Sequence, residues 1–291
     1  MHTTQLIMAA SVGDVPVAAV VCALVAATVE ALCSPKTWLP HVSKDEDAEV
    51  VAGRVKKWGI TTLKLDRCGL KSLPVYKLCI VAYQIKELDV SYNKLRELSG
   101  AFLQSCTALE ILNCSDNKLS SLPEAIGECT ALQKLDCGSN CLSSLPEKLC
   151  MCTALQELSC HSTNLSSLPV DLGACTALQS LVCFHTKLES LPAGLGACKV
   201  LHELWCSHTQ LSALPAELGQ CTALRKLDCS YNKLRVLPVE LGLLNNLTIF
   251  SCRNNPFEEG ALTTIEALRA ATHKDDTPST QTWWTDFHRR R

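Results

Sequence analysis

Aromatic and charged side chains are scarce in this sequence. Aromatic residues make up only 5% of the 291 residues and charged residues 19%, with a formal net charge of −2. No basic patch stands out except the terminal Arg289–Arg291, so nothing indicates nucleic-acid binding. A hydrophobic content of 47% is enough for a sizeable core and argues against general disorder. Because aromatics are few, any place where several gather is informative.

The N-terminal region lacks the features of a membrane span or a typical signal peptide. Residues 15–29 are uncharged and mostly apolar, but a membrane-spanning helix needs about 20 such residues. The opening MHTTQLIMAASVGD contains no basic residue of the kind that begins a signal peptide. We therefore expect residues 1–42 to form an apolar N-terminal segment whose helix packs against the rest of the protein. A cleaved signal or a membrane anchor through residues 15–29 is the alternative.

Cysteine, by contrast, is abundant, with 19 residues. In a small secreted protein such a number indicates a disulfide framework, whereas in a larger intracellular chain it indicates metal binding, catalysis or buried thiols. The stretch LVCFHTKLESLP, residues 181–192, raises the question because Cys183 and His185 lie close together in it. The spacing of the cysteines along the chain has to decide.

A 23-residue unit repeats along the chain, as in TALQELSCHSTNLSSLPVDLGAC and the TALQSLVCFHTKLESLPAGLGAC that follows it. Successive copies begin at Thr107, Thr130, Thr153, Thr176, Lys199 and Thr222. Two upstream segments, from Ile60 and Ile85, fit with slightly longer spacings, and NLTIFSCRNNPF closes the series at Phe257. These segments make nine units with the pattern L-x-x-L-x-C-x-x-[N/T]-x-L-x-x-L-P-x-x-L-G-x-C.

The pattern resembles the leucine-rich repeat, whose period is roughly 20–29 residues, and is most similar to the intracellular Ras-group and plant intracellular type. The resemblance covers residues 60–257. It implies an α/β solenoid, a leucine-rich repeat horseshoe with a concave parallel β-sheet and short helices or turns on the convex side. The residues agree: L-x-x-L-x-C alternates like a strand with one buried face, and the proline that follows can open a turn. One unit cannot bury its apolar face alone, so stacked units share a core.

Most cysteines occupy two positions of the repeat. One position holds Cys114, Cys137, Cys160, Cys183, Cys206, Cys229 and Cys252. The other holds Cys106, Cys129, Cys152, Cys175, Cys198 and Cys221. The pattern turns both positions inward, where free cysteine acts as a small buried hydrophobe. We expect buried thiols in place of leucine, with disulfides between stacked neighbours as the alternative, and we predict no catalytic residue, no metal site and no cofactor.

The position after each strand holds asparagine in five units and threonine in three consecutive units. The asparagines are Asn93, Asn117, Asn140, Asn232 and Asn255. In the family, such asparagines bond the backbone of the adjacent turn, and a threonine hydroxyl can do part of this work. The threonine units, with Thr163, Thr186 and Thr209, are also those with nearby histidines. They represent either a recent duplication without functional meaning or a specialised patch.

The resemblance places the non-leucine strand positions, and those just after the strand, on the concave side. There the fifth to eighth units gather three aromatics and three histidines. We predict that a protein partner binds at His161, Val182, Phe184, His185, Glu203, Trp205, His208, Lys226, Asp228 and Tyr231. Neighbouring strands lie about 4.8 Å apart, so Phe184, Trp205 and Tyr231 are expected to form one exposed patch of the kind that anchors interfaces. An ordinary polar surface is the alternative.

Both ends of the repeat region are expected to carry a cap. Residues 43–59 predict an N-terminal cap helix, because Ser43 and Glu46 fit a capping box and Gly59 suits its end. Residues 258–273 predict a C-terminal cap helix with one apolar face. Residues 274–291 have no repeat, and we expect a disordered tail in which Trp283 and Trp284 either dock elsewhere or pack back on the cap.

The sequence therefore indicates a non-enzymatic scaffold or adaptor that binds a protein partner on its concave face, and the resemblance suggests a role in intracellular signalling. No nucleic acid and no small-molecule substrate is expected as a partner, and the expected location is the cytoplasm. The alternatives are a secreted or membrane-anchored recognition protein and a regulatory subunit of an enzyme. Fold-level resemblance alone does not choose among them.

Overall fold

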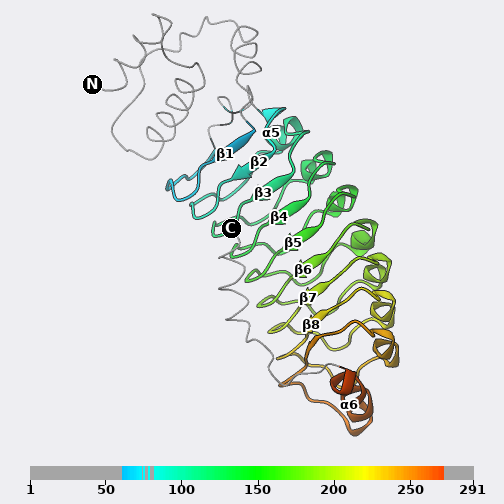
Figure 1. Ribbon diagram of the computed structural model, residues 1–291. Helices are drawn as coiled ribbons and strands as arrows, with labels where there is room; N and C mark the ends of the chain where they lie inside the picture. The colour runs from blue at the N-terminus through cyan, green and yellow to red at the C-terminus, as the bar shows by residue number, and fades with distance from the viewer. Residues whose placement is uncertain (1–60, 74, 76–77, 79–81, 272–291) are drawn as a thin grey trace, which may run out of the picture.

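The computed structural model describes residues 61–73, 75, 78 and 82–271. The expectations for residues 1–42, 43–59 and 274–291 concern parts of the chain outside this description. The described chain forms an elongated solenoid of stacked coils, with strands along one side and short helices along the other (Figure 1).

Each coil contributes one three-residue strand to a single parallel sheet. The strands are β1 (Thr62–Lys64), β2 (Glu87–Asp89), β3 (Ile111–Asn113), β4 (Lys134–Asp136), β5 (Glu157–Ser159), β6 (Ser180–Val182), β7 (Glu203–Trp205), β8 (Lys226–Asp228) and β9 (Ile249–Ser251). They follow one another in sequence order, and every strand pairs with the next at the same position of the repeat. The sequence expectation of an α/β solenoid with nine stacked units is confirmed.

The repeat builds the core by alternation along each strand. The middle residue of every strand is buried, and so is the residue two positions after it, as Leu181 and Cys183 show in β6. The first and third strand residues lie on the opposite face of the sheet, which we call the concave face. Because the leucines and cysteines of successive coils stack on one another, one continuous core runs from Leu63 to Leu268.

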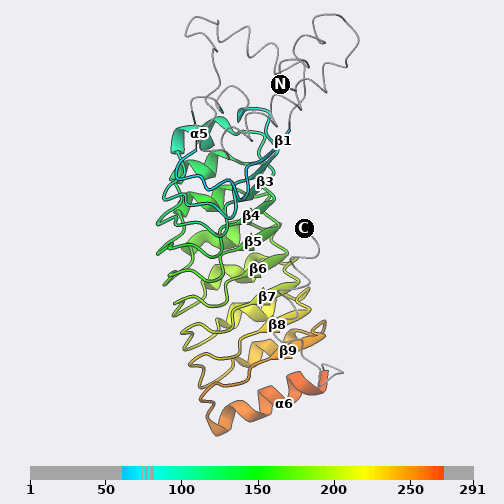
Figure 2. The same ribbon diagram turned by 90° about the vertical axis from the view of Figure 1, so that its left-hand side faces the viewer.

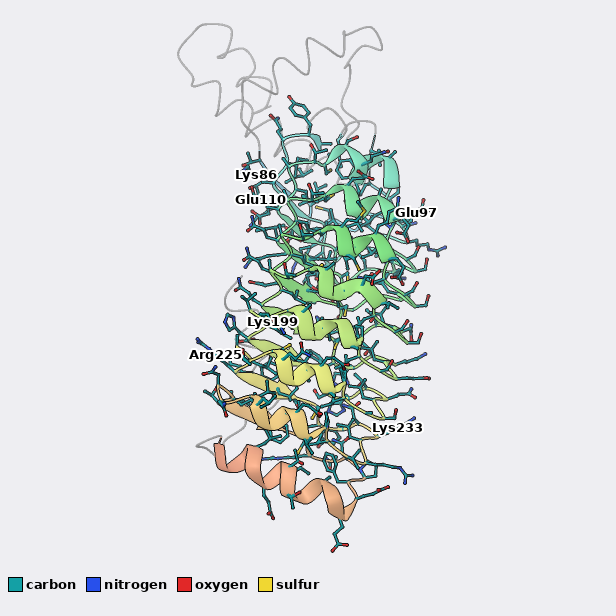
Figure 3. The ribbon with its side chains drawn as sticks, turned by 90° about the vertical axis from the view of Figure 1, so that its right-hand side faces the viewer. Lys86, Glu97, Glu110, Lys199, Arg225 and Lys233 are labelled. Carbon is teal, nitrogen blue, oxygen red and sulfur yellow. The ribbon has the colours of Figure 1, made fainter. Side chains whose placement is uncertain are left out.

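Proline begins the convex side of most coils. Six short 3-10 helices each follow a proline: η1 (Glu124–Glu128), η2 (Glu147–Met151), η3 (Val170–Ala174), η4 (Ala193–Ala197), η5 (Ala216–Gln220) and η6 (Val239–Leu243). Proline cannot continue the ladder and has a φ suited to a helical start, so the strand cannot extend. In an earlier coil, α5 (Gly100–Ser105) takes the place of the 3-10 helix, with Ser99 accepting the Phe102 N–H at its start. Figure 3 shows these helices on one face, with Lys86 and Glu110 along one edge of it and Glu97 along the other.

The 13 cysteines of the two repeat positions are all buried and free, so the expectation of buried thiols is confirmed. In the second position, five of the six thiols also donate to a backbone carbonyl of a neighbouring coil, whereas Cys106 donates to Phe102 in its own coil. Cys152 Sγ lies 3.3 Å from the Ile126 oxygen, and Cys221 Sγ lies 3.2 Å from the Leu195 oxygen. A leucine could not donate these bonds. Cys68, outside the two positions, is disulfide-bonded.

Asparagine and threonine bond the turns to different extents. Asn140 Nδ2 donates to the carbonyls of Cys114, Cys137 and Gly138, and its oxygen accepts the Leu119 N–H at 2.9 Å. Thr163 and Thr186 each donate to one carbonyl of their own turn. The Thr209 hydroxyl lies within bonding distance of both the Cys206 carbonyl and Asn232 Oδ1, and its one proton can go to either acceptor. The threonine coils thus have fewer bonds between neighbouring turns, as the hydroxyl's single donor requires.

After β9 the chain continues through η7 (Glu259–Ala261) into α6 (Leu262–Ala271). Ile265 and Leu268 of α6 are buried against the last coil, and Figure 2 shows the helix lying across the end of the solenoid below β9. Among the described residues, none of the helices has the length and apolar character that crossing a membrane requires.

Candidate binding surface on the concave face

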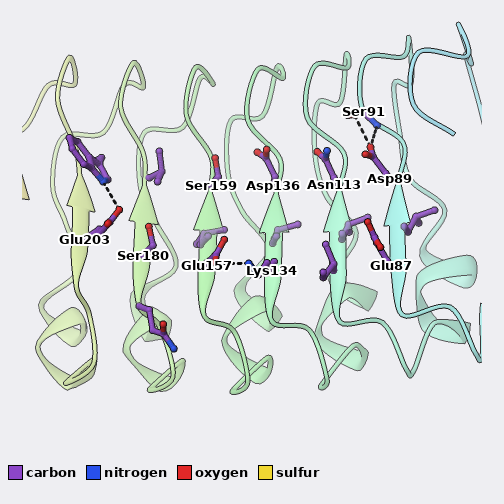
Figure 4. Close-up of a pocket in the computed structure, with 18 of the residues that line it drawn as sticks. Glu87, Asp89, Ser91, Asn113, Lys134, Asp136, Glu157, Ser159, Ser180 and Glu203 are labelled. Carbon is purple, nitrogen blue, oxygen red and sulfur yellow. Dashed lines mark hydrogen bonds and ion pairs between the residues drawn. The ribbon is translucent and has the colours of Figure 1, made fainter. Parts of the chain in front are cut away.

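A long groove follows the concave face of the sheet. Its volume is about 910 Å³, and residues of every strand from β1 to β9 line it. Figure 4 shows its central part, where the first and third residues of successive strands stand side by side in two rows. We call these the first row and the third row.

The first row contains two ion pairs between neighbouring strands. Lys134 Nζ lies 2.7 Å from Glu157 Oε1, and Lys226 Nζ lies 2.8 Å from Glu203 Oε1, in each case across neighbouring strands. Glu203 also accepts the Trp205 indole N–H at 3.2 Å. Such partly exposed pairs add little stability. Their effect is to fix the positions of charged groups along the floor of the groove.

In the third row, β2, β3, β4 and β8 end in a residue that accepts a backbone N–H. The side-chain oxygens of Asp89, Asn113, Asp136 and Asp228 each accept the N–H two residues further on, at 3.0–3.2 Å. Such bonds fix a tight turn. In β5, β6 and β7 the same position holds Ser159, Val182 and Trp205. The middle of the groove therefore has a different chemistry from both of its ends.

Val182, Phe184 and Trp205 form an apolar cluster separate from the main core, which we call the aromatic cluster. Their exposed fractions are 2%, 5% and 2%. The expectation that Phe184 and Trp205 are exposed is therefore wrong, although both lie on the concave side. Mutual packing contributes to this burial: Val182 pairs with Trp205 across the sheet, and Phe184 follows Val182 by two residues, so each side chain covers part of its neighbour.

The ring of His161 extends the aromatic cluster toward β4. It stacks on Phe184 with ring centroids 5.0 Å apart and an interplanar angle of 12°. On its other side lies Gly138, where an added Cβ would come within 2.4 Å of His161 Nε2. Gly138 therefore provides the space for the ring. Gly138 is not among the predicted site residues. It occupies the second position after its strand, which holds Ser115, His161 and Phe184 in nearby coils, and no other coil has glycine there.

Next to the cluster, three further rings stack in the turns that follow the strands. His185 and His208 have ring centroids 4.4 Å apart, and His208 and Tyr231 are 4.1 Å apart with an interplanar angle of 11°. We call these three residues the stacked row. Each has a left-handed backbone, with φ of 52°, 52° and 56°, as does the same position in every other coil. That shared conformation directs the three rings the same way and brings them into contact.

The stacked row meets the aromatic cluster where Phe184 and His185 make an edge-on contact at 5.5 Å. The predicted patch of Phe184, Trp205 and Tyr231 is thus divided between the cluster and the row. Of the ten predicted site residues, five are buried: His161, Val182, Phe184, Trp205 and Asp228. Glu203, His208 and Lys226 are half-buried, and His185 and Tyr231 are exposed.

Ionisation in this region is governed by burial. Partial burial and the neighbouring His208 lower the pKa of His185 from its usual value of 6.5, which favours the neutral ring at neutral pH. Burial raises the pKa of Cys183 to about 12, so its thiol is not a nucleophile for His185. Within the described residues, no three His, Cys, Asp or Glu side chains converge to hold a metal ion.

Comparison with known families and structures identifies proteins of related sequence and architecture. A family model described as leucine-rich repeat matches residues 84–142. Comparison with curated proteins finds no match. The similar solved structures include a leucine-rich repeat protein of Leptospira interrogans, with 25% identity and a TM-score of 0.65 over 80% of this chain.

Two further structures are similar. The functional domain of InlJ from Listeria monocytogenes, which includes a cysteine ladder, is 30% identical over 74% of this chain with a TM-score of 0.62. The ectodomain of the Arabidopsis thaliana receptor kinase GASSHO1/SCHENGEN3, in complex with CASPARIAN STRIP INTEGRITY FACTOR 2, is 29% identical over 71% with a TM-score of 0.63. The chain spans 63%, 44% and 26% of the lengths of these three structures.

Proposed function

Since the chain is a leucine-rich repeat protein, we propose that it is a non-enzymatic scaffold that binds a protein partner along its concave groove, at the aromatic cluster and the stacked row. The observation that carries the proposal is the continuous series of rings from His161 through Phe184, His185 and His208 to Tyr231. Together with Trp205, the series gathers three of the chain's 14 Phe, Trp and Tyr residues and three of its eight histidines on one face. Interfaces are enriched in aromatic anchors of this kind.

The groove offers both apolar and polar contacts to a partner. The stacked row presents exposed ring edges and faces, held by a left-handed backbone that keeps them in place. The partly exposed ion pairs of the first row, Lys134–Glu157 and Lys226–Glu203, supply the polar contacts. Binding then rests on shape and side-chain complementarity, without bond-making chemistry.

A site-specific crosslinking experiment tests the location of binding. Photo-reactive benzoylphenylalanine replaces Tyr231, which is 49% exposed on the concave side, or Val239, which is 75% exposed on the convex side. We expect a partner protein to crosslink from position 231 and not from position 239. Equal yields from both positions, or a yield from position 239 alone, would contradict the proposed surface.

The crosslinked partner, once purified, is then titrated against variants. Tyr231→Asn and His208→Asn remove rings of the stacked row while keeping a residue that tolerates a left-handed backbone. We expect each to raise the dissociation constant by about tenfold or more, as loss of an interface anchor does. Val239→Ser, the control on the convex side, is expected to leave it within about twofold.

A second candidate function is recognition outside the cell, as a secreted or membrane-anchored protein. It is favoured by the disulfide at Cys68, because disulfides persist in oxidising compartments. The similar receptor-kinase ectodomain, solved with CASPARIAN STRIP INTEGRITY FACTOR 2, also supports it. The cytoplasmic location, by contrast, is supported by the 13 free buried thiols, because thiols stay reduced in that compartment.

Protein purified from its native source distinguishes the two locations. N-terminal sequencing shows whether residues 1–33 are absent, and peptide mapping without reduction shows whether Cys68 is oxidised. A chain that starts at residue 1 and carries a reduced Cys68 supports the cytoplasmic scaffold. Loss of the N-terminal segment together with an oxidised Cys68 supports the extracellular recognition protein.

A further inference from the structure

The third row is more deeply buried in the middle of the concave face than toward its ends. In the third row, Asp136, Ser159, Val182, Trp205 and Asp228 of β4–β8 are all buried, whereas the same position is only half-buried in β2, β3 and β9. Side chains on an open sheet face are exposed to water unless another element lies on them, and parallel sheets are usually covered on both faces. The burial therefore indicates an occupant along the middle of the groove.

We propose that this occupant is the protein's own C-terminal segment, residues 272–291, which folds back along the concave groove. Its aromatic side chains Trp283, Trp284 and Phe287 pack on the aromatic cluster, and Arg289–Arg291 lie beside the carboxylates further along. The inference concerns the same surface as the proposed function. Only its consequence, that a partner must displace the segment, rests on that function.

The length of the segment is sufficient. The described chain ends with α6 at Ala271, at the β9 end of the solenoid. Five strand spacings separate β9 from β4, or about 24 Å at 4.8 Å each. The 20 residues that follow Ala271 can extend over roughly 65 Å at about 3.3 Å per residue. This leaves ample chain to pass from α6 to the concave side before reaching the groove.

The order of side chains along the segment matches the order of features along the groove. A chain that enters from the β9 end meets the aromatic cluster on β6 and β7 before it reaches the acidic side chains near β2–β4, which are Asp89, Asp116 and Asp136. In the segment, the three aromatics likewise precede the three arginines.

The spacing agrees as well. From Phe287 to Arg290 is about 10 Å of extended chain, and the coils of Phe184 and Asp136 are two strand spacings apart, also about 10 Å. An extended segment that places Phe287 on the aromatic cluster therefore brings the guanidinium group of Arg290 near the carboxylate of Asp136. Guanidinium–carboxylate pairs are among the stronger charged contacts.

Intramolecular crosslinking in the full-length chain tests the contact. Benzoylphenylalanine replaces Phe287, and the crosslinked peptides are mapped by mass spectrometry in a mixture of light and isotope-labelled chains. We expect crosslinks to β6, β7 and the turns that follow them, within single chains only. Crosslinks to α6 or the convex helices, crosslinks that join light and labelled chains, or no preferred site would each overturn the proposal.

A competition experiment supplies an independent readout. A fluorescent synthetic peptide of residues 272–291 is titrated against the full-length chain and against a full-length variant with Trp283→Ser, Trp284→Ser and Phe287→Ser. We expect the peptide to bind the variant at least tenfold more tightly than the wild-type chain, whose groove is already occupied. Equal affinities, or no binding to the variant, would overturn the proposal. A peptide with the three aromatics replaced by serine is the matched control and is expected not to bind.

The two proposals can fail separately. If the Phe287 crosslinks fall elsewhere but a partner still crosslinks from position 231, the concave binding surface stands and the C-terminal segment is not its occupant. If the segment lies in the groove and no partner crosslinks from position 231, the scaffold function fails while the intramolecular contact stands.

Discussion

At the scale of single residues, the repeat position sets the chemistry of each side chain more than the residue type does. Cys183 follows β6 directly, and Cys141 lies in the turn after β4. Both are free cysteines, yet Cys183 is fully buried and Cys141 is exposed. Likewise His161, the second residue after its strand, is buried between Gly138 and Phe184. His185, the third residue after the next strand, is exposed. Reactivity and titration should follow these positions.

Thiol reactivity is the first consequence. Burial raises the pKa of Cys183 from 9.0 to about 12, so its thiolate fraction at a given pH is about 1,000-fold smaller. Among the described free cysteines, we expect iodoacetamide at pH 8 to alkylate Cys141 first. The 13 cysteines of the two repeat positions should react only after denaturation. Peptide mapping after timed labelling measures this, and rapid native labelling of Cys183 would contradict the buried position.

Titration of the stacked row is the second consequence. Burial and His208 lower the pKa of His185 below 6.5, so below that pH the unfolded chain binds more protons at this residue than the folded chain. The free energy of unfolding therefore falls as the pH drops from about 6.5 toward the lowered value. We expect urea unfolding midpoints to fall less between pH 7.5 and 5.5 in His185→Asn than in the wild type.

Val239→Ser is the control for this titration, because it changes an exposed convex residue without removing an ionisable group. It should keep the wild-type dependence on pH. An unchanged pH dependence in His185→Asn would show that the stacked row does not disfavour the charged ring.

At the scale of elements, the short convex helices are held by close contacts between coils. The glycine of the Leu-Gly pair lies against the next helix: an added Cβ at Gly219 would come within 2.3 Å of the Glu240 oxygen. At Gly242, in the same repeat position of η6, an added Cβ would meet nothing within 4 Å. The close backbone contact that requires glycine at position 219 is therefore absent at position 242.

These two glycines make a matched pair. We expect Gly219→Ala to lower the free energy of unfolding by about 1–3 kcal/mol, because the methyl group forces backbone shifts in a packed contact. Gly242→Ala should be neutral or stabilising by up to about 1 kcal/mol, since alanine restricts the unfolded chain. Urea unfolding of both variants measures the difference. Equal effects would contradict the close packing of η5 on η6.

At the scale of the whole molecule, stability is distributed along one dimension. Each strand pairs only with its neighbours in sequence, and each 3-10 helix packs on the helices of adjacent coils. Interior coils therefore have two stabilising neighbours, and coils at the ends depend on whatever covers them. Beyond β9 that cover is α6, which buries Ile265 and Leu268 against the last coil.

Native-state hydrogen exchange should reveal this gradient. We expect backbone amides that bond between coils in the interior, such as Cys160 N–H to the Val182 oxygen, to exchange more slowly than the equivalent Cys229 N–H to the Ser251 oxygen near the end. Local opening needs fewer broken interfaces at an end than in the interior. Weakening α6 with Leu268→Ala should speed exchange at Cys229 before it affects Cys160. Uniform exchange along the chain would indicate a single cooperative unit instead.

The sequence by itself determined the solenoid, the register of its nine strands, the proline-initiated helices and the inward direction of the cysteines. It could do so because these features recur every 23 residues, and each unit buries its leucines only by stacking on the next. It also located the rings of the concave side, since the strand period assigns side chains to faces.

Only the tertiary structure decided which of those rings reach solvent. Phe184 and Trp205 pack with Val182 in one buried apolar cluster, and His161 lies where Gly138 leaves room for its ring. His185, His208 and Tyr231 stack because all three share a left-handed backbone. Each outcome depends on the particular side chain in the neighbouring coil, and the pattern common to all units leaves that choice open.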